Sequence, residues 1–285
     1  MTWTELVMAA APMQGDQPAV SDVRTGEVLS YAAFSRRVTR AAAGLQAQGL
    51  RYGERVLVDV PLGAALPVAV HAVAWAGGIA VLGSHGESRI SITYDRYDPA
   101  AVKADLVFSF RPVPGARPFS ELVGPAAVEF GPLAGPALTL DGSRLLDNAE
   151  LATDLRRLAT RLVVGKDDVL ISAVSEPFRG LRTIDLAMTA GAHVVVAHEP
   201  SLVGCRVLAQ ERRATVVVAP PTTWPGGCWA TPPCGSSTKG RSSVRLACEK
   251  CDTVRECDPS ATQGEHMPDS PPAQPAGRAQ PVRRT

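Results

Sequence analysis

The chain has 285 residues, of which 45% are hydrophobic and 20% charged, and its formal net charge is +1. Charges of both signs are mixed along the sequence. This excludes a polycationic protein of the kind that coats nucleic acid or a membrane surface, while the length allows a sizeable core. Residues 1–13 contain Glu5 and lack the basic start of a secretory signal, so we expect a cytoplasmic protein.

The first elements predicted are a β-hairpin and a helix. Residues 17–31 read as two short strands joined at Thr25-Gly26. Ser30 is placed to cap a helix over residues 31–48, and Gly49 ends that helix. The N-terminal part of the chain is therefore expected to mix strand and helix.

The rest of the fold is organised around residues 49–83. A valine-rich run at residues 55–60 predicts a buried strand, residues 64–76 predict an apolar helix ended by two glycines, and residues 79–82 predict a second strand. A strand, a helix and a strand this close together favour a parallel crossover unit. The predicted fold class is therefore α/β, with layered parallel sheets.

The same stretch raises the question of a membrane span. Between Val60 and Leu82 His71 is the only ionisable side chain. Pro61, Pro67 and the paired glycines interrupt the run, which favours the strand, helix and strand. We expect no membrane span.

Two further strands are predicted downstream, at residues 90–94 and 105–109, where short apolar runs are bounded by turn residues.

Three segments carry a family resemblance. They are Leu29–Phe34 (LSYAAF), Gly49–Val56 (GLRYGERV) and Trp75–Leu82 (WAGGIAVL). In this order and spacing they resemble the opening of the adenylate-forming superfamily, which contains acyl-CoA synthetases, aryl-CoA ligases and adenylation domains. The resemblance continues downstream, where it implies strands at residues 167–173, 191–196 and 213–222 and a helix at residues 183–189. It implies a partial AMP-binding domain over residues 1–224. For the intact family it also implies a fatty-acid or aryl-acid CoA ligase that uses ATP, magnesium and coenzyme A.

The family's phosphate loop is a run of serine, threonine and glycine that ends in lysine. Small residues let backbone N–H groups close around a triphosphate, and the lysine adds positive charge. The corresponding place is expected at residues 129–140, which contain no lysine, no serine and two prolines that lack an N–H. Residues 137–149 resemble the helix that follows the loop in the family. The resemblance therefore implies a chain with no catalytic residue and no bound cofactor, unable to form an acyl adenylate alone.

Two residues are candidates for a substrate pocket. Phe178 stands where the family carries an aromatic residue of the acyl pocket, although Arg179 beside it would bring a charge into an apolar site. His198 follows a predicted strand, at the end where open α/β sheets bind ligands. His198 has no adjacent base, nucleophile or metal ligand, so we do not expect it to be catalytic. His71 and Cys205 are expected in the core.

The composition changes after Trp224. Residues 225–285 contain fifteen prolines and glycines and only four residues of the Ile, Leu and Val type, which predicts a low-complexity, disordered tail. Cys248 and Cys251 form a CxxC pair, but a zinc site needs four ligands at suitable spacing, so no metal is expected. A frame change near Trp224 is a hypothesis that would explain the missing remainder of the family's domain.

Three functions remain open. The first is a truncated, degenerate relative of acyl-CoA synthetases. The second is a binding module that holds an acyl or aryl carboxylate, or that self-associates or docks on a full-length relative through exposed sheet edges. The third is an active acid-CoA ligase that uses unrecognised residues. No nucleic-acid partner is expected.

Overall fold

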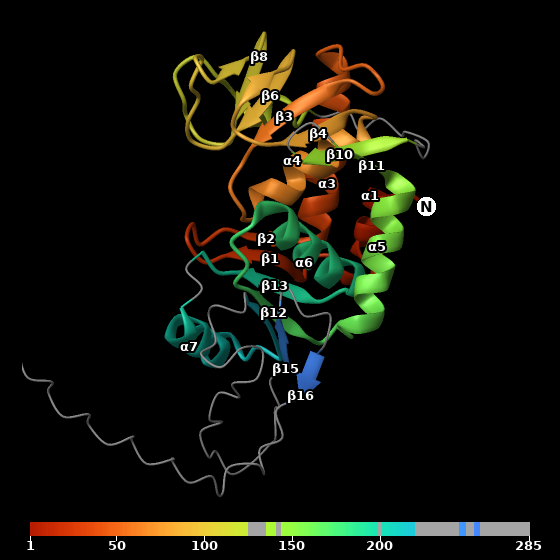
Figure 1. Ribbon diagram of the computed structural model, residues 1–285, viewed down its shortest axis with the longest axis vertical. Helices are drawn as coiled ribbons and strands as arrows, with labels where there is room; N and C mark the ends of the chain where they lie inside the picture. The colour runs from red at the N-terminus through yellow and green to blue at the C-terminus, as the bar shows by residue number, and fades with distance from the viewer. Residues whose placement is uncertain (125–134, 141–143, 199–200, 220–244, 249–253, 257–285) are drawn as a thin grey trace, which may run out of the picture.

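The structure, a computed structural model, describes residues 1–124, 135–140, 144–198, 201–219, 245–248 and 254–256. Within these residues two seven-stranded sheets lie one above the other, with helices packed between them (Figure 1). We call them sheet A and sheet B. Most neighbouring strands are parallel, so the predicted α/β class with layered parallel sheets is confirmed.

Sheet A has the strand order β16-β15-β14-β12-β13-β1-β2. Its outer strands β2 and β16 run antiparallel to their neighbours, and the strands between are parallel. The predicted N-terminal hairpin is present as β1 and β2. The strands are β1 (Pro18–Asp22), β2 (Val28–Ser30), β12 (Val169–Ser172), β13 (His193–Val196), β14 (Val216–Ala219), β15 (Arg245–Cys248) and β16 (Val254–Glu256).

Strands β15 and β16 come from the segment for which the sequence predicts disorder. They continue sheet A from β14 through parallel and then antiparallel pairing. The remaining residues of 225–285 lie outside the described residues, and so do Cys251 and the predicted boundary at residue 224. The disordered tail and that domain boundary therefore stay predictions.

Sheet B has the strand order β11-β10-β4-β3-β6-β8-β9. All of its pairs are parallel except that of β10 with β11. The strands are β3 (Arg55–Asp59), β4 (Ile79–Leu82), β6 (Ile90–Thr93), β8 (Leu106–Ser109), β9 (Arg117–Pro118), β10 (Pro136–Leu140) and β11 (Arg144–Asp147), and a separate pair is formed by β5 (Gly86–Glu87) and β7 (Val102–Lys103).

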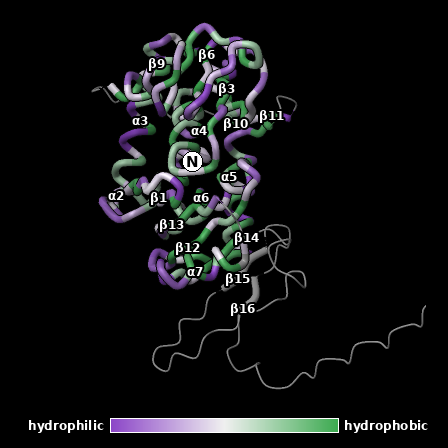
Figure 2. Tube along the Cα trace, turned by 90° about the vertical axis from the view of Figure 1, so that its left-hand side faces the viewer, coloured by the Kyte–Doolittle hydropathy of each residue, from purple (hydrophilic) through white to green (hydrophobic). Residues whose placement is uncertain are grey.

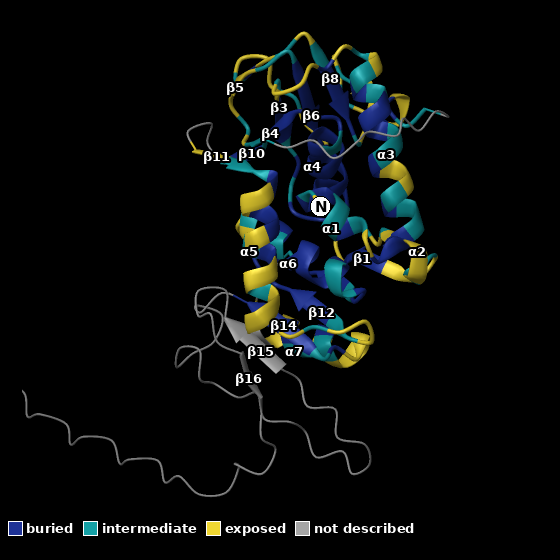
Figure 3. Ribbon diagram, turned by 90° about the vertical axis from the view of Figure 1, so that its right-hand side faces the viewer, coloured by how far each residue is buried: buried dark blue, intermediate teal, exposed yellow. Residues whose placement is uncertain are grey.

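The helices between the sheets form one hydrophobic core with both of them. Helix α4 is buried along nearly its whole length, whereas α5 keeps one face exposed (Figure 3). The helices are α1 (Trp3–Met8), α2 (Ala11–Gln14), α3 (Tyr31–Ala47), α4 (Ala65–Trp75), α5 (Asn148–Arg161), α6 (Pro177–Ala190), α7 (Leu202–Arg212) and a 3-10 turn (Phe119–Glu121).

The predicted crossover unit is β3-α4-β4. Arg55 pairs with Ile79 in parallel register, and α4 lies over both strands against α3 (Figure 1). Hydrophobic residues fill α4, as the green tube in Figure 2 shows. Even so, no helix within the described ranges has the length and apolar character needed to cross a membrane.

Sheet A is buried on both faces because its central strands alternate between two cores. Leu170 and Val194 face the helices between the sheets. Ile171 and Val195, one residue further along each strand, face α7 together with Cys205. This period of two is what a pleated strand imposes. The expected core placement of Cys205 is confirmed, since its side chain is buried.

Two expected helices differ from the structure. The helix expected over residues 137–149 was wrong: Pro136–Leu140 and Arg144–Asp147 are strands, and helix begins only at Asn148. A capping box between Asp147 and Glu150 fixes that start. Helix α6 is longer than the predicted 183–189, because Glu176 caps it and Pro177 occupies its first turn.

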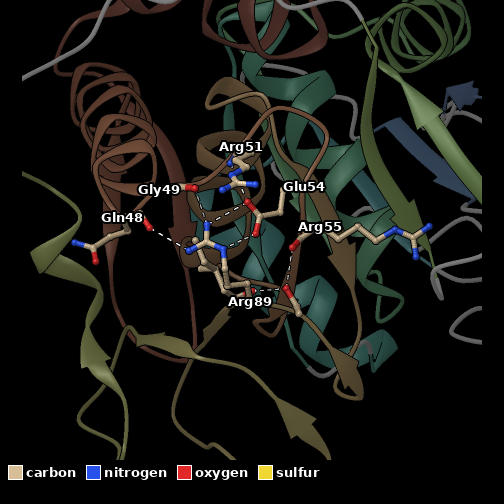
Figure 4. Close-up of polar contacts among 8 residues, drawn as sticks. Gln48, Gly49, Arg51, Glu54, Arg55 and Arg89 are labelled. Carbon is tan, nitrogen blue, oxygen red and sulfur yellow. Dashed lines mark hydrogen bonds and ion pairs between the residues drawn. The ribbon is translucent and has the colours of Figure 1, made fainter.

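A polar cluster explains why the GLRYGERV segment is a scaffold motif. Gly49 and Gly53 adopt positive φ angles of 83° and 74°, which favour glycine. Glu54 then accepts hydrogen bonds from the Arg89 guanidinium, with an Nε–Oε1 distance of 2.6 Å (Figure 4). Arg89 also donates to the carbonyls of Gln48 and Gly49. Chiefly through this hydrogen bond, the pKa of Glu54 is lowered. The cluster fastens the α3–β3 turn to the residue before β6.

A second polar cluster is buried between the helices. Asp185 of α6 accepts from the Trp3 indole at 2.9 Å and from His71 at 3.0 Å. The other ring nitrogen of His71 lies 3.0 Å from the Thr4 hydroxyl. All four side chains are at most 2% exposed. The expected packed role of His71 is therefore confirmed, and its neighbours come from α1 and α6.

We predict that Asp185→Ala lowers the free energy of unfolding by about 3–5 kcal/mol, because it leaves the buried Trp3 and His71 donors without an acceptor. Urea denaturation followed by circular dichroism measures the change. Asp16→Ala, at an exposed position, is the matched control and should stay within about 0.5 kcal/mol of the parent. Equal stability of the two variants would contradict the prediction.

Candidate functional site

The parallel strands of both sheets end along one side of the molecule, around a cleft that we call the interlayer cleft. It has a volume of about 660 Å³ and is lined by residues after β3, β4 and β6 of sheet B, together with Arg24 after β1 and Glu176 before α6. Ligands of open α/β sheets bind outside the carboxyl ends of the strands. The interlayer cleft is therefore the first candidate for a binding site.

The charged lining of the interlayer cleft contains more carboxylates than guanidinium groups. Asp59, Asp95 and Glu176 line it with Arg24 and Arg96. The Arg96 Nε lies 3.8 Å from Asp59 Oδ2. Burial raises the pKa of Asp59 above its usual value, although the charge of Arg96 opposes this shift. A carboxyl with a raised pKa can hold or accept a proton near neutrality more readily than an exposed one.

His198 and Asp22 form a pair at the ends of β13 and β1. The His198 Nε2 atom lies 2.8 Å from Asp22 Oδ1, which also accepts from the backbone N–H groups of Arg24 and Thr25. The carboxylate packs so closely on Gly63 that a side chain at this glycine would clash with it. Burial tends to raise the pKa of Asp22, but the hydrogen bond and charge of His198 and the two N–H groups outweigh this and lower it. His198 is thus held by Asp22, and the expectation that it is not catalytic stays a prediction.

The second predicted pocket residue lies elsewhere. Phe178, in the first turn of α6, lines a cavity of about 560 Å³ between α5, α6 and the β10–β11 hairpin, which does not include His198. The sequence suggested that Arg179 would bring a charge into an apolar pocket. In the structure its side chain is instead 43% exposed and lies beside Glu176. The two candidates are therefore not brought together, and a substrate-pocket role for either stays a prediction.

The connection between β10 and β11 is short, and it lies next to the stretch where the resemblance places a phosphate loop. The strands pair in antiparallel register up to Leu140 and Arg144, so only residues 141–143 connect them. Those three residues lie outside the described ranges, and the sequence there is Asp-Gly-Ser. The expected loop position at residues 129–140 was wrong in part, since Pro136–Leu140 is a buried strand beside β4. Residues 129–134 also lie outside the described part of the chain.

Sequence reasoning missed the arrangement of Thr4, His71 and Asp185, which has the hydroxyl, imidazole and carboxylate order of a nucleophilic triad. The pairs are separated by 67 and 114 residues along the chain, so no local pattern contains them. Polar residues on otherwise buried helix faces were the one available signal. Because the three side chains are at most 1% exposed, the arrangement is a structural network with no access for a substrate.

No group of three or more metal-ligating side chains occurs in the portion of the chain that the structure describes. The CxxC pair lies largely beyond that portion, since Cys251 is not described and Cys248 is placed only as part of β15. The prediction about metal binding at this pair therefore remains open.

Comparison with known proteins agrees with this architecture. Residues 7–89 match the family model described as AMP-binding enzyme. This part of the chain is similar to the AMP-binding enzymes. The match covers the hairpin, the β3-α4-β4 unit and the turn held by Arg89, which are the segments that carried the resemblance in the sequence. No curated protein matches the sequence.

Solved structures extend the likeness in fold to most of the chain. They include Mycobacterium smegmatis MbtA (21% identity, TM-score 0.65), a putative long-chain-fatty-acid CoA ligase from Rhodopseudomonas palustris (18%, 0.67) and a benzoate CoA ligase from Burkholderia xenovorans (20%, 0.63). Each alignment covers 78% of this chain, and 49%, 64% and 51% of the respective structures. The chain thus spans about half to two-thirds of their length and shares the fold of their N-terminal region.

We predict that the free energy of unfolding of Asp22→Asn falls less steeply than that of the parent as the pH is lowered into the acid range. Because the folded-state pKa of Asp22 lies below its ordinary value of 3.8, the carboxylate contributes stability that is fully present above that value and is lost as the pH falls through the folded-state pKa. Urea denaturation between about pH 5 and pH 2 measures this loss. Asp16→Asn is the control at an exposed carboxylate, and a parent-like acid limb in Asp22→Asn would refute the prediction.

Proposed function

We propose that this chain is a relative of ATP-dependent acid-CoA ligases that does not form an acyl adenylate by itself. The observation that carries the proposal is the three-residue connection between β10 and β11. A phosphate loop needs several successive backbone N–H groups and a fixed positive charge around the triphosphate. A connection of three residues without lysine offers neither the length nor that charge.

The described surroundings of this hairpin support the same proposal. The nearest cavity is lined by Asp147, Glu150 and Asp154 in addition to Arg144, Arg157 and Arg182. Arg182 is paired with Asp154 at 2.6 Å. The carboxylates match the guanidinium groups in number, so this cavity offers no excess of positive charge to a triphosphate.

We predict no carboxylate-dependent exchange of pyrophosphate into ATP by the purified chain, with fatty acids and aryl acids as substrates and magnesium present. An intact enzyme such as the benzoate CoA ligase serves as the positive control under the same conditions. Thermal unfolding with and without ATP provides a second measurement, and no rise in Tm with ATP is expected. Formation of an acyl-AMP by this chain would overturn the proposal.

A protein-binding role is the second candidate, and exposed apolar side chains at sheet edges favour it. Val28 on the edge strand β2 is 58% exposed, and Leu145 on the edge strand β11 of sheet B is 43% exposed. Open strand edges that carry apolar residues pair readily with another chain. A second copy of this chain or a longer relative could occupy such an edge.

We predict concentration-dependent self-association that falls when Val28→Lys and Leu145→Lys are combined, because lysine on an edge strand opposes pairing. Light scattering after size-exclusion chromatography measures the molar mass. The control is Val163→Lys, at a residue that is 65% exposed but lies after α5 and outside the strands. A compact monomer of the parent chain at all concentrations would count against this candidate.

A further inference from the structure

A groove with aromatic side chains in its lining lies beside the N-terminal hairpin. It has a volume of about 660 Å³ and is lined by residues that follow β6 and β8, together with Glu27 and Arg37. We call it the aromatic groove, after Tyr94, Phe110 and Phe119. It shares no lining residue with the interlayer cleft, so the two are separate surfaces of the described chain.

The aromatic part of the groove is fixed in place by packing and by hydrogen bonds. The rings of Phe110 and Phe119 are stacked, with centroids 4.1 Å apart. Tyr94 and Phe119 are buried, whereas Phe110 is half-buried and supplies the open aromatic surface. The buried Ser109 hydroxyl lies 2.9 Å from the Tyr94 carbonyl and 2.6 Å from the Arg111 carbonyl. The backbone on both sides of Phe110 is thus ordered before anything binds, which reduces the cost of binding.

Three charged side chains line the aromatic groove, and together they leave one positive charge in excess. Glu27 is engaged, because it accepts from Arg37 at 2.7 Å. Arg111 is exposed, and its Cζ atom lies 5.8 Å from the centroid of the Tyr94 ring. Among the described residues Arg111 has no carboxylate partner. The groove therefore suits an occupant that is apolar and carries negative charge.

The chain contains a segment of this chemistry. Residues 265–275 read Glu-His-Met-Pro-Asp-Ser-Pro-Pro-Ala-Gln-Pro, with two carboxylates and no lysine or arginine, and they lie outside the described residues. Pro268 and Pro271 are three residues apart, and so are Pro272 and Pro275, which is one turn of a polyproline II helix. Proline-rich segments with this spacing dock in aromatic-lined grooves. In such a helix Asp269 shares a face with the second pair of prolines.

The chain is long enough for this segment to reach the groove. Glu256 ends β16 at one edge of sheet A, and Glu27 of the groove directly precedes β2 at the other edge. Six strand spacings separate β16 from β2, which amounts to about 29 Å. The eleven residues between Glu256 and Pro268 span about 40 Å when extended.

We propose that residues 265–275 dock in the aromatic groove of the same chain, with prolines against Phe110 and Asp269 paired with Arg111. The interlayer cleft does not suit this segment, because its three carboxylates outnumber its two guanidinium groups and repel further negative charge. The docking requires no nucleotide and no acyl transfer. The inference is therefore independent of the proposed absence of adenylation.

Photo-cross-linking of the full chain tests the contact. The photo-reactive residue p-benzoylphenylalanine replaces Ser120, an exposed residue of the groove, and mass spectrometry identifies the peptides joined by irradiation. We expect the monomer to contain cross-links from position 120 to residues 265–275. The same replacement at Val163, which is 65% exposed and outside the groove, is the control and should give no cross-link to this segment. Equal cross-linking from both positions, no cross-link to this segment, or cross-links to it in covalent dimers alone would overturn the inference.

A charge swap tests the pairing of Asp269 with Arg111. Asp269→Arg should lower the yield of the cross-link about two- to fivefold, as the loss of an exposed ion pair predicts. Adding Arg111→Asp to this variant should restore the yield. Adding Arg36→Asp instead, at an exposed guanidinium of α3 outside the groove, should not. A yield restored equally by both, or by neither, would refute the site, whereas pyrophosphate exchange responds to none of these variants.

Discussion

Both oxygens of the Asp185 carboxylate accept hydrogen bonds in the layer between the two sheets, where the side chain is fully buried. One bond comes from Trp3 of α1 and the other from His71 of α4, so three helices from distant parts of the chain meet at one side chain. Burying a polar group is costly unless its hydrogen bonds are satisfied. The relative positions of α1, α4 and α6 therefore depend on this contact, and so does the stacking of sheet B over sheet A.

Because the helices between the sheets hold sheet B over sheet A, the carboxyl ends of strands from both sheets meet around the interlayer cleft. Arg24 follows β1 of sheet A, yet its guanidinium lies against Tyr94, which follows β6 of sheet B. The interlayer cleft, which Arg24 lines, has more carboxylates than guanidinium groups.

The segments that match the AMP-binding family model belong to the packed scaffold, whereas the strands β10 and β11 are joined by a connection of three residues. Gly49, Gly53, Glu54 and Arg89 keep the turn into β3, a structural task that needs no ligand. At β10 and β11 the chain instead closes the edge of sheet B with a short antiparallel connection. A fold can keep its packing while losing a binding loop, because the core and the loop depend on different residues.

Local patterns in the sequence were enough to predict the hairpin, the Ser30 cap and the β3-α4-β4 unit, since these follow from periodicity, glycine and capping within a few residues. The strands β12 to β14 were expected from the family resemblance. The strand character of Pro136–Leu140 was not predictable in this way, because it depends on pairing with β4, more than fifty residues earlier. The candidates Phe178 and His198 were placed by resemblance and strand order alone, and the structure puts them in separate surroundings. The Asp185 network and the two guanidinium groups on Tyr94 join residues that are far apart in the chain, so only tertiary packing could bring them together.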